Sequence, residues 1–65
     1  MYVCAASELN ADHVGHEVLV RRIRGILKGS VPMPGRDDAR LLVIGGIKVF
    51  ALDAEPVTVL DAPMP

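Results

Sequence analysis

Two apolar runs between Arg40 and Leu52 dominate the hydrophobic pattern of the chain, and they meet at Gly45-Gly46. A pair of glycines between two apolar runs predicts a β-hairpin with a tight turn. Apart from Arg40 at its start, the hairpin contains one charged residue, Lys48. Apolar side chains must therefore occupy both faces of the hairpin. One face must cover the core of the domain. We expect the hairpin to contact a second copy through residues of the set Leu42, Ile44, Ile47, Val49, Phe50 and Leu52.

A second hairpin is predicted before this one, over residues 16–21 and 23–31. Its apolar positions alternate with polar ones, and the phase slips at Arg21-Arg22, which indicates a turn or a bulge. Gly25 lies inside the second strand, where a glycine marks a sharp bend or a close approach of another backbone. Two prolines and a glycine then predict an exposed loop over residues 31–39.

The two ends of the chain complete the pattern. Residues 1–6 are apolar and favour a short strand that pairs elsewhere, and Ser7 is a typical N-cap for a short helix over residues 7–14. β-Branched residues predict a last strand over 57–60, and a tail with two prolines follows at 61–65. A short helix followed by five short strands is typical of a mainly β fold. We expect a small, strongly bent, five-stranded β-barrel in a single domain.

The length of 65 residues limits the core that one copy can bury. Chains below about 70–80 residues rarely gain more than ~3–5 kcal/mol from their own core and usually need a disulfide, a metal or a partner. Cys4 is the single cysteine and cannot close an intrachain disulfide. His13 and His16 lack the further ligands of a zinc site, and Cys4 in an apolar run is expected to be an inert thiol. We therefore expect no metal, no cofactor, no enzymatic site and a homo-oligomer.

Charge is segregated along the chain, although the formal net charge is only -1. All 7 Lys and Arg residues lie between positions 21 and 48, where Asp37 and Asp38 are the only acids. A basic cluster of this kind predicts contacts with the phosphates of RNA or DNA. An aromatic content of 3% opposes that hypothesis, since single-strand binders stack bases on several rings. The candidate phosphate-binding residues are Arg21, Arg22, Arg24 and Lys28.

Residues 7–31 resemble the Sm-like proteins, the group that includes Sm, LSm and Hfq. Leu9-Asn10 resembles the helix of that family, and the segment from Val14 to Arg21 resembles its first strand. The glycine-bent second strand of the family resembles Ile23-Arg24-Gly25-Ile26-Leu27-Lys28-Gly29. Ile44-Gly45-Gly46 also resembles the Ile-Arg-Gly of the second motif of the family. Sm-like proteins form five-stranded barrels that join edge to edge into rings and bind RNA. The resemblance therefore implies a barrel, a ring of copies and RNA binding.

Two functions stay open from the sequence. The first is a non-enzymatic, oligomeric module for protein interaction or assembly, and the second is an RNA- or DNA-binding ring that uses the basic cluster. The chain has no apolar run of transmembrane length, and Glu8 and Asp12 lie where a signal peptide would be basic. We therefore expect no membrane contact and a cytoplasmic location. A composition rich in Ala, Val, Arg and Asp is common in phage proteins, which makes a phage origin one hypothesis.

Overall fold

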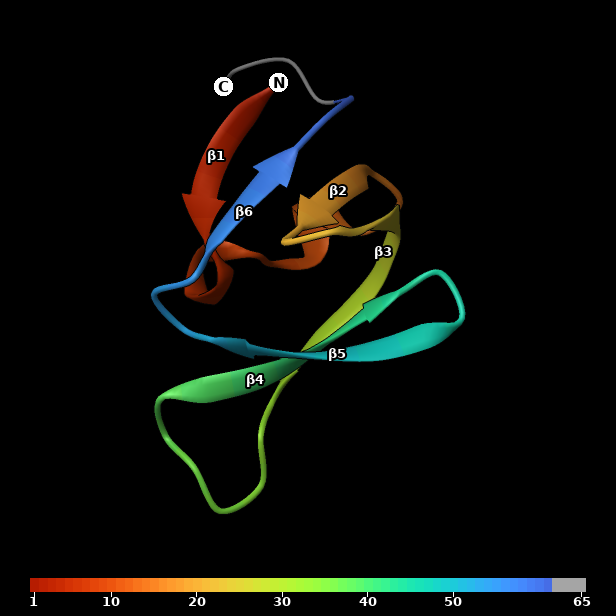
Figure 1. Ribbon diagram of the computed structural model, residues 1–65. Coiled ribbons are helices and arrows are strands. Elements are labelled where there is room, and N and C mark those ends of the chain that lie inside the picture. Colours follow the sequence, from red (N-terminus) through yellow and green to blue (C-terminus); the bar gives the residue numbers. More distant parts are fainter. Residues whose placement is uncertain (62–65) are drawn as a thin grey trace.

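The computed structural model describes residues 1–61, and the regular structure in this range consists of β-strands and short 3-10 turns. The strands form one antiparallel sheet in the order β1-β6-β2-β3-β4-β5 (Figure 1). The mainly β class predicted from the sequence is thus confirmed. The tail predicted at 61–65 lies outside the described residues, except for Asp61. The elements are β1 (Tyr2–Ala5), η1 (Ala6–Glu8), η2 (Ala11–His13), β2 (Glu17–Val20), β3 (Ile23–Pro32), β4 (Ala39–Ile44), β5 (Ile47–Leu52) and β6 (Pro56–Val59).

The sheet bends sharply because β3 belongs to both of its halves (Figure 1). The first part of β3 pairs with β2 from Ile23 to Ile26, and the second part pairs with β4 from Leu27 to Pro32. The register shifts between Leu27 and Gly29, where a bulge increases the local twist and bends the strand. As a result, β1, β6 and β2 lie on one side of the molecule, and β4 and β5 lie on the other.

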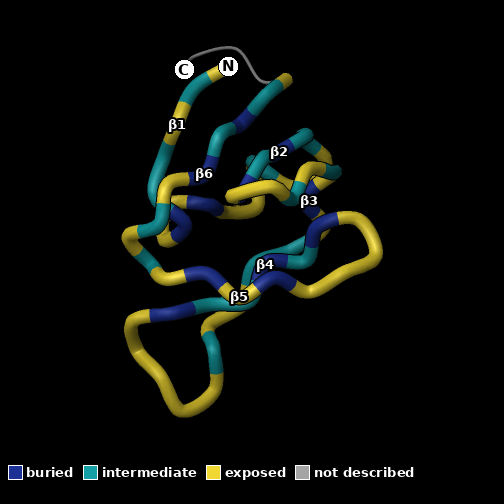
Figure 2. Tube along the Cα trace, in the orientation of Figure 1, coloured by how far each residue is buried: buried dark blue, intermediate teal, exposed yellow. Residues whose placement is uncertain are grey.

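The hydrophobic core lies between these two halves, as the buried stretches in Figure 2 indicate. Every strand from β2 to β6 contributes inward-pointing aliphatic side chains, and η1 and the residue after it close one end. Burying each Val, Leu or Ile side chain contributes about 1.5–3 kcal/mol relative to leaving it in water. The members of this core are Ala6, Leu9, Val18, Val20, Leu27, Leu42, Ile44, Val49, Ala51, Val57 and Val59.

The short helix predicted over residues 7–14 is wrong, since two separate 3-10 turns, η1 and η2, occupy this segment. Asn10 is the physical reason. Its side chain accepts a hydrogen bond from the Asp12 amide at 2.8 Å, and its own amide donates to His13 Nδ1 at 3.1 Å. These contacts begin a new turn instead of continuing the first one. The extended residue between the turns, Leu9, enters the core.

The closed five-stranded barrel predicted from the sequence is also wrong, because the sheet stays open between β1 and β5. The N-terminal strand β1 pairs with β6 along its whole length and gives the described chain a sixth strand. It thereby occupies the edge of β6, so the last strand has no free side for β5. At the gap, η1 meets the end of β5, where the Ser7 amide donates to the Asp53 carbonyl at 3.0 Å.

The predicted turns are confirmed. Gly45-Gly46 joins β4 to β5, and Gly45 has a φ of 61°, in the left-handed region that favours glycine. Arg21-Arg22 joins β2 to β3, and Arg21 has a φ of 55° although it carries a side chain. The exposed loop predicted over 31–39 is shorter than expected, because β3 continues to Pro32 and β4 begins at Ala39.

The close approach predicted at Gly25 is confirmed, since a Cβ at this position would lie 3.0 Å from Ile44 Cγ2. Ile44 is buried and must shift to admit a side chain, so Gly25→Val should lower the free energy of unfolding by ~1–3 kcal/mol. Gly29→Val is the matched control in the same strand, because a Cβ there meets nothing within 4 Å. Chemical denaturation measures both variants. Natural stability in Gly25→Val would contradict a tight approach at the bend.

Candidate interaction surface

The side of β3, β4 and β5 that points away from the core carries mostly apolar side chains. We call it the outer face and define it by Val31, Leu41, Val43, Phe50 and Leu52. The strand register places Val31, Leu41 and Phe50 in one row across the three strands. Val31, Phe50 and Leu52 are 50%, 39% and 45% exposed, respectively. Three neighbouring strands thus present large apolar side chains to solvent, where an antiparallel sheet usually presents polar ones.

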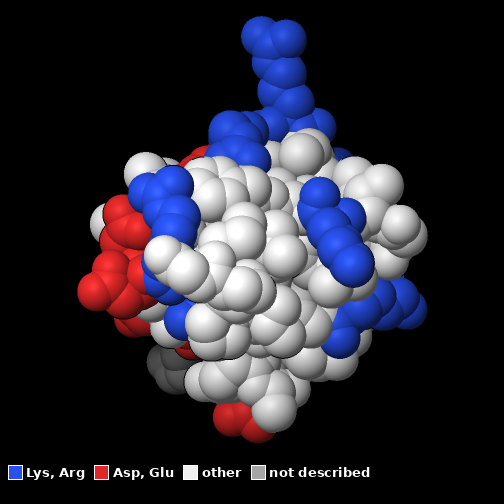
Figure 3. Space-filling view, turned by 90° about the horizontal axis from the view of Figure 1, so that it is seen from below, with Lys and Arg blue, Asp and Glu red and all other residues white. Residues whose placement is uncertain are grey.

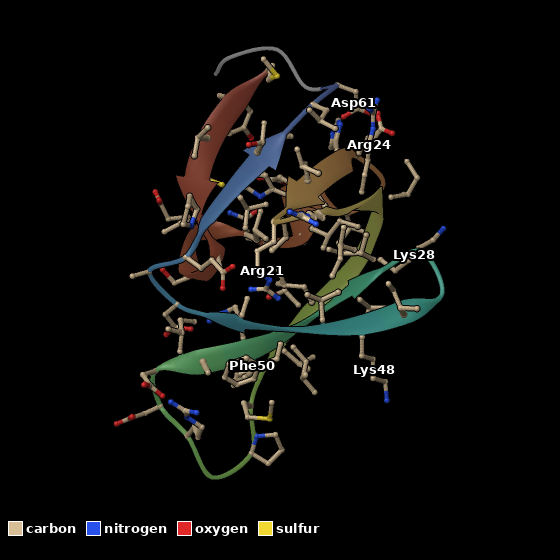
Figure 4. The ribbon with its side chains drawn as sticks, viewed as in Figure 1. Arg21, Arg24, Lys28, Lys48, Phe50 and Asp61 are labelled. Atoms are coloured by element: carbon tan, nitrogen blue, oxygen red, sulfur yellow. The ribbon has the colours of Figure 1, made fainter. Side chains whose placement is uncertain are left out.

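The centre of the outer face carries no charge, whereas basic side chains lie around it. Figure 4 shows Phe50 and Lys48 pointing away from the rest of the sheet, and Figure 3, drawn from that side, shows an uncharged centre flanked by Lys and Arg. The guanidinium of Arg36, from the loop between β3 and β4, lies 5.4 Å from the centre of the Phe50 ring. Arg36 also donates two hydrogen bonds of 3.0 Å to Asp38, and this contact lowers the pKa of the Asp38 carboxyl.

The structure divides the six residues predicted to form an oligomer interface into two groups. Leu42, Ile44 and Val49 point inward and are buried in the core, so they cannot contact a second copy in this fold. The alternation of the strands explains this correction, because it sends neighbouring residues of one strand to opposite faces. Phe50 and Leu52 belong to the outer face, and Ile47 is exposed at the beginning of β5. For these three residues the interface stays a prediction.

Val31 belongs to the outer face, but the sequence pattern did not identify it as a site residue. From Ile23 to Leu27, the odd-numbered positions of β3 point toward the core. The register shift after Leu27 reverses this order, so that Ser30 lies opposite the buried Leu42 and Val31 lies opposite Leu41. A bulge leaves only a weak trace in a single sequence. The best available signal was the pair of small residues Gly29-Ser30, which loosen the strand at this point.

Arg21 lies at the open edge of β5. Its guanidinium donates a hydrogen bond of 2.7 Å to the Phe50 carbonyl and forms an ion pair with the Glu55 carboxylate. The Phe50 carbonyl therefore points away from β4, toward the side where the sheet has no further strand. The positive φ of Arg21 directs the side chain from the β2–β3 turn, and a non-glycine residue in this region is strained.

The structure does not bring the four predicted phosphate-binding residues onto one ridge. Figure 4 shows Arg21, Arg24 and Lys28 extending in different directions. Arg24 forms two hydrogen bonds with the Glu17 carboxylate, at 2.9 and 3.2 Å, just as Arg21 is paired with an acid of its own chain. Among residues 1–61, no acidic side chain pairs with the exposed Arg22 and Lys28. These two residues are the members of the cluster that keep an uncompensated charge.

A polar contact fastens the end of β6 to the start of β2. One oxygen of Asp61, Oδ1, accepts a hydrogen bond from the Glu17 amide at 3.0 Å and lies 3.1 Å from His16 Nδ1. The amide hydrogen bond, aided by His16, lowers the pKa of Asp61. The contact joins two segments far apart in sequence and has a structural role.

The remaining candidates for chemistry have local structural contacts. The ring of His13 accepts the Asn10 amide and lies 6.3 Å from the ring of Tyr2. Burial raises the pKa of the Cys4 thiol, which disfavours a reactive thiolate. Residues 1–61 contain no group of three or more His, Cys, Asp or Glu placed to hold a metal, and no pocket. No helix in the described range is long and apolar enough to cross a membrane.

Comparison of the chain with protein-family models, with curated proteins and with solved structures found no match. The Sm-like resemblance stays a prediction. The geometry of the outer face and of the β5 edge carries the functional inference.

Acid should weaken the contact at Asp61. A carboxyl whose pKa is lowered by folding stabilises the fold fully above its ordinary pKa of about 4, and this stabilisation is lost as the pH falls through the folded value. Asp61→Asn should therefore reduce the dependence of the unfolding free energy on pH below about 4. Asp37→Asn is the control, because residues 1–61 donate no hydrogen bond to the Asp37 side chain. An unchanged pH dependence in Asp61→Asn, measured by denaturation at several pH values, would contradict the assignment.

Proposed function

We propose that this chain is a cytoplasmic, non-enzymatic module for protein assembly, which binds a second copy of itself through β5 and the adjoining outer face. The observation that carries the proposal is that the β4–β5 hairpin is apolar on both sides, and that Phe50 and Leu52 on its outer side stay exposed while its inner side lies on the core. The exposed side chains at the contact are Val31, Ile47, Phe50 and Leu52.

The size of the core supports this proposal. A single chain of 65 residues gains little stability from its own core, and burial of apolar surface in a contact adds about 25 cal/mol for each Å² removed from water. Phe50 is the largest exposed side chain of the outer face, and its aromatic ring is the kind of residue that anchors protein contacts. A second copy would remove this ring and its apolar neighbours from water.

The distribution of charge is also compatible with contact between identical surfaces. Four of the basic residues are paired with acids of the same chain, in the pairs Arg21–Glu55, Arg24–Glu17, Arg36–Asp38 and Arg40–Asp53. Arg36, the basic residue that covers Phe50, is among them. Lys48 is the charged residue of β5 itself, and it lies beside the apolar row rather than in it. Two copies can therefore meet without placing a large uncompensated charge in the contact.

The alternative, an RNA- or DNA-binding Sm-like ring, retains support from Arg22 and Lys28, which are exposed and unpaired with acids of the described chain. Its test is binding of single-stranded RNA and DNA at ~50 mM salt, where electrostatic attraction is screened least. Binding that weakens steeply with salt and is reduced by Arg22→Ala would favour the alternative. We regard assembly as the function that the exposed apolar surface supports better.

The natural chain should therefore show a mass above the 7.0 kDa of one copy in sedimentation at micromolar concentration. Phe50→Thr should shift the population toward the single copy, because threonine keeps the preference for a strand and removes the aromatic ring. Val14→Thr is the matched control, since Val14 is 46% exposed but lies outside the sheet. If the chain without substitutions sediments as a single copy at micromolar concentrations, the proposed function is refuted. Equal effects of the two substitutions would exclude the outer face as the contact.

A further inference from the structure

The open edge of β5 has a defined set of backbone groups that pair with no other strand of the described sheet. In an antiparallel strand, the amide and carbonyl of one residue point to the same side, and this side alternates along the strand. The Phe50 carbonyl leaves β4 and reaches Arg21, so the backbone groups of Lys48, Phe50 and Leu52 face the open edge. The Leu52 carbonyl accepts the Glu55 amide at 3.0 Å within the same chain. Val49 and Ala51 face β4 instead. Ile47, Lys48, Phe50 and Leu52 are all exposed residues, and η1 contacts β5.

We propose that the β5 strand of a second copy pairs antiparallel with this edge, in a two-fold register centred on Phe50, and that Arg21 is the displaceable cap of the edge. The proposal rests on the proposed self-association and specifies its surface. It follows from the geometry of β5 and from the Arg21 side chain that binds the Phe50 carbonyl.

The register explains why the occupant is a second copy. A two-fold axis at Phe50 places this residue opposite Phe50 of the second copy, and aromatic pairs on neighbouring strands attract each other. The same axis places Lys48 opposite Leu52 of the second copy, so that two lysines do not face each other. The row of Val31, Leu41 and Phe50 would continue across the contact into the same row of the other copy. The edge is therefore compatible with itself in apolar pattern, and the register keeps the two Lys48 residues from lying opposite each other.

Arg21 can lose its hydrogen bond to the Phe50 carbonyl and still keep an acidic partner. One terminal nitrogen of the guanidinium contacts Glu55, and the other donates to the Phe50 carbonyl. When β5 strands pair, the Phe50 amide of the second copy donates to this carbonyl and replaces the hydrogen bond from Arg21. The ion pair with Glu55 can persist. The cap thus exchanges one hydrogen bond for an equivalent one, and it protects the edge in the single copy.

Proline at position 48 tests the pairing directly. Because the Lys48 amide faces the open edge, Lys48→Pro keeps the β4–β5 pairing and removes a donor that the second copy needs. We expect sedimentation equilibrium to show that Lys48→Pro no longer associates. The matched control Lys48→Thr keeps the amide and should associate as strongly as the unsubstituted chain. If the natural chain and Lys48→Pro associate equally, the edge pairing is overturned while the proposed function stands, since the contact would then use the outer face alone.

Substitution of Arg21 tests the cap. Arg21→Gly removes the guanidinium and is compatible with the positive φ at this position, so the turn should be retained. Each of the two copies loses one competing hydrogen bond, so the dissociation constant of the pair should fall about 25-fold. If Arg21→Gly associates as strongly as the unsubstituted chain, or more weakly, Arg21 is not a cap of the edge. Near-natural thermal stability in this variant verifies that the comparison is made between folded chains.

Disulfide trapping tests the register in a Cys4→Ser background. Phe50→Cys should cross-link to itself, whereas Lys48→Cys and Leu52→Cys should cross-link only when the two variants are mixed. Self-linking of Lys48→Cys at the same rate as Phe50→Cys would exclude the register centred on Phe50.

Discussion

The structure depends on the bend in β3, the strand that pairs with β2 over its first part and with β4 over its second. Gly25 permits the bend, because any side chain there would press on the buried Ile44. The register shift between Leu27 and Gly29 completes it. Only in this bent form do the two halves of the sheet bury their inner faces against each other. Without the bend, the aliphatic residues of β2, β5 and β6 would have no common core.

The same bend determines which surface stays uncovered. By exchanging the two faces of β3, the register shift turns Val31 outward, in line with Leu41 and Phe50. β5 is the last strand in the spatial order of the described sheet, so this row ends at an open edge. Two arginines gather around Phe50, Arg36 over its ring and Arg21 at its carbonyl, and each is paired with an acid. These contacts shield an apolar edge residue in the single copy and can be exchanged for contacts with a second one.

The sequence predicted features that depend on local rules and missed features that depend on distant contacts. The Gly45-Gly46 hairpin, the turn at Arg21-Arg22 and the crowding at Gly25 follow from the conformational freedom of glycine and from the phase of alternation. The N-terminal helix failed because Asn10 caps a new turn, and barrel closure failed because β1 pairs with the last strand, which lies at the other end of the sequence. The basic cluster also appeared continuous in sequence, but Glu17 and Glu55 neutralise Arg24 and Arg21 from other strands and turns.

Hydrogen exchange along β5, recorded by NMR at increasing protein concentration, tests the central claim that copies meet at this edge. The Val49 amide pairs with β4 and should be protected at every concentration. The Phe50 amide faces the open edge and should exchange rapidly in dilute solution, then become protected as the concentration rises and a second copy binds. Rapid exchange of the Phe50 amide at concentrations where the chain is fully associated would contradict the claim.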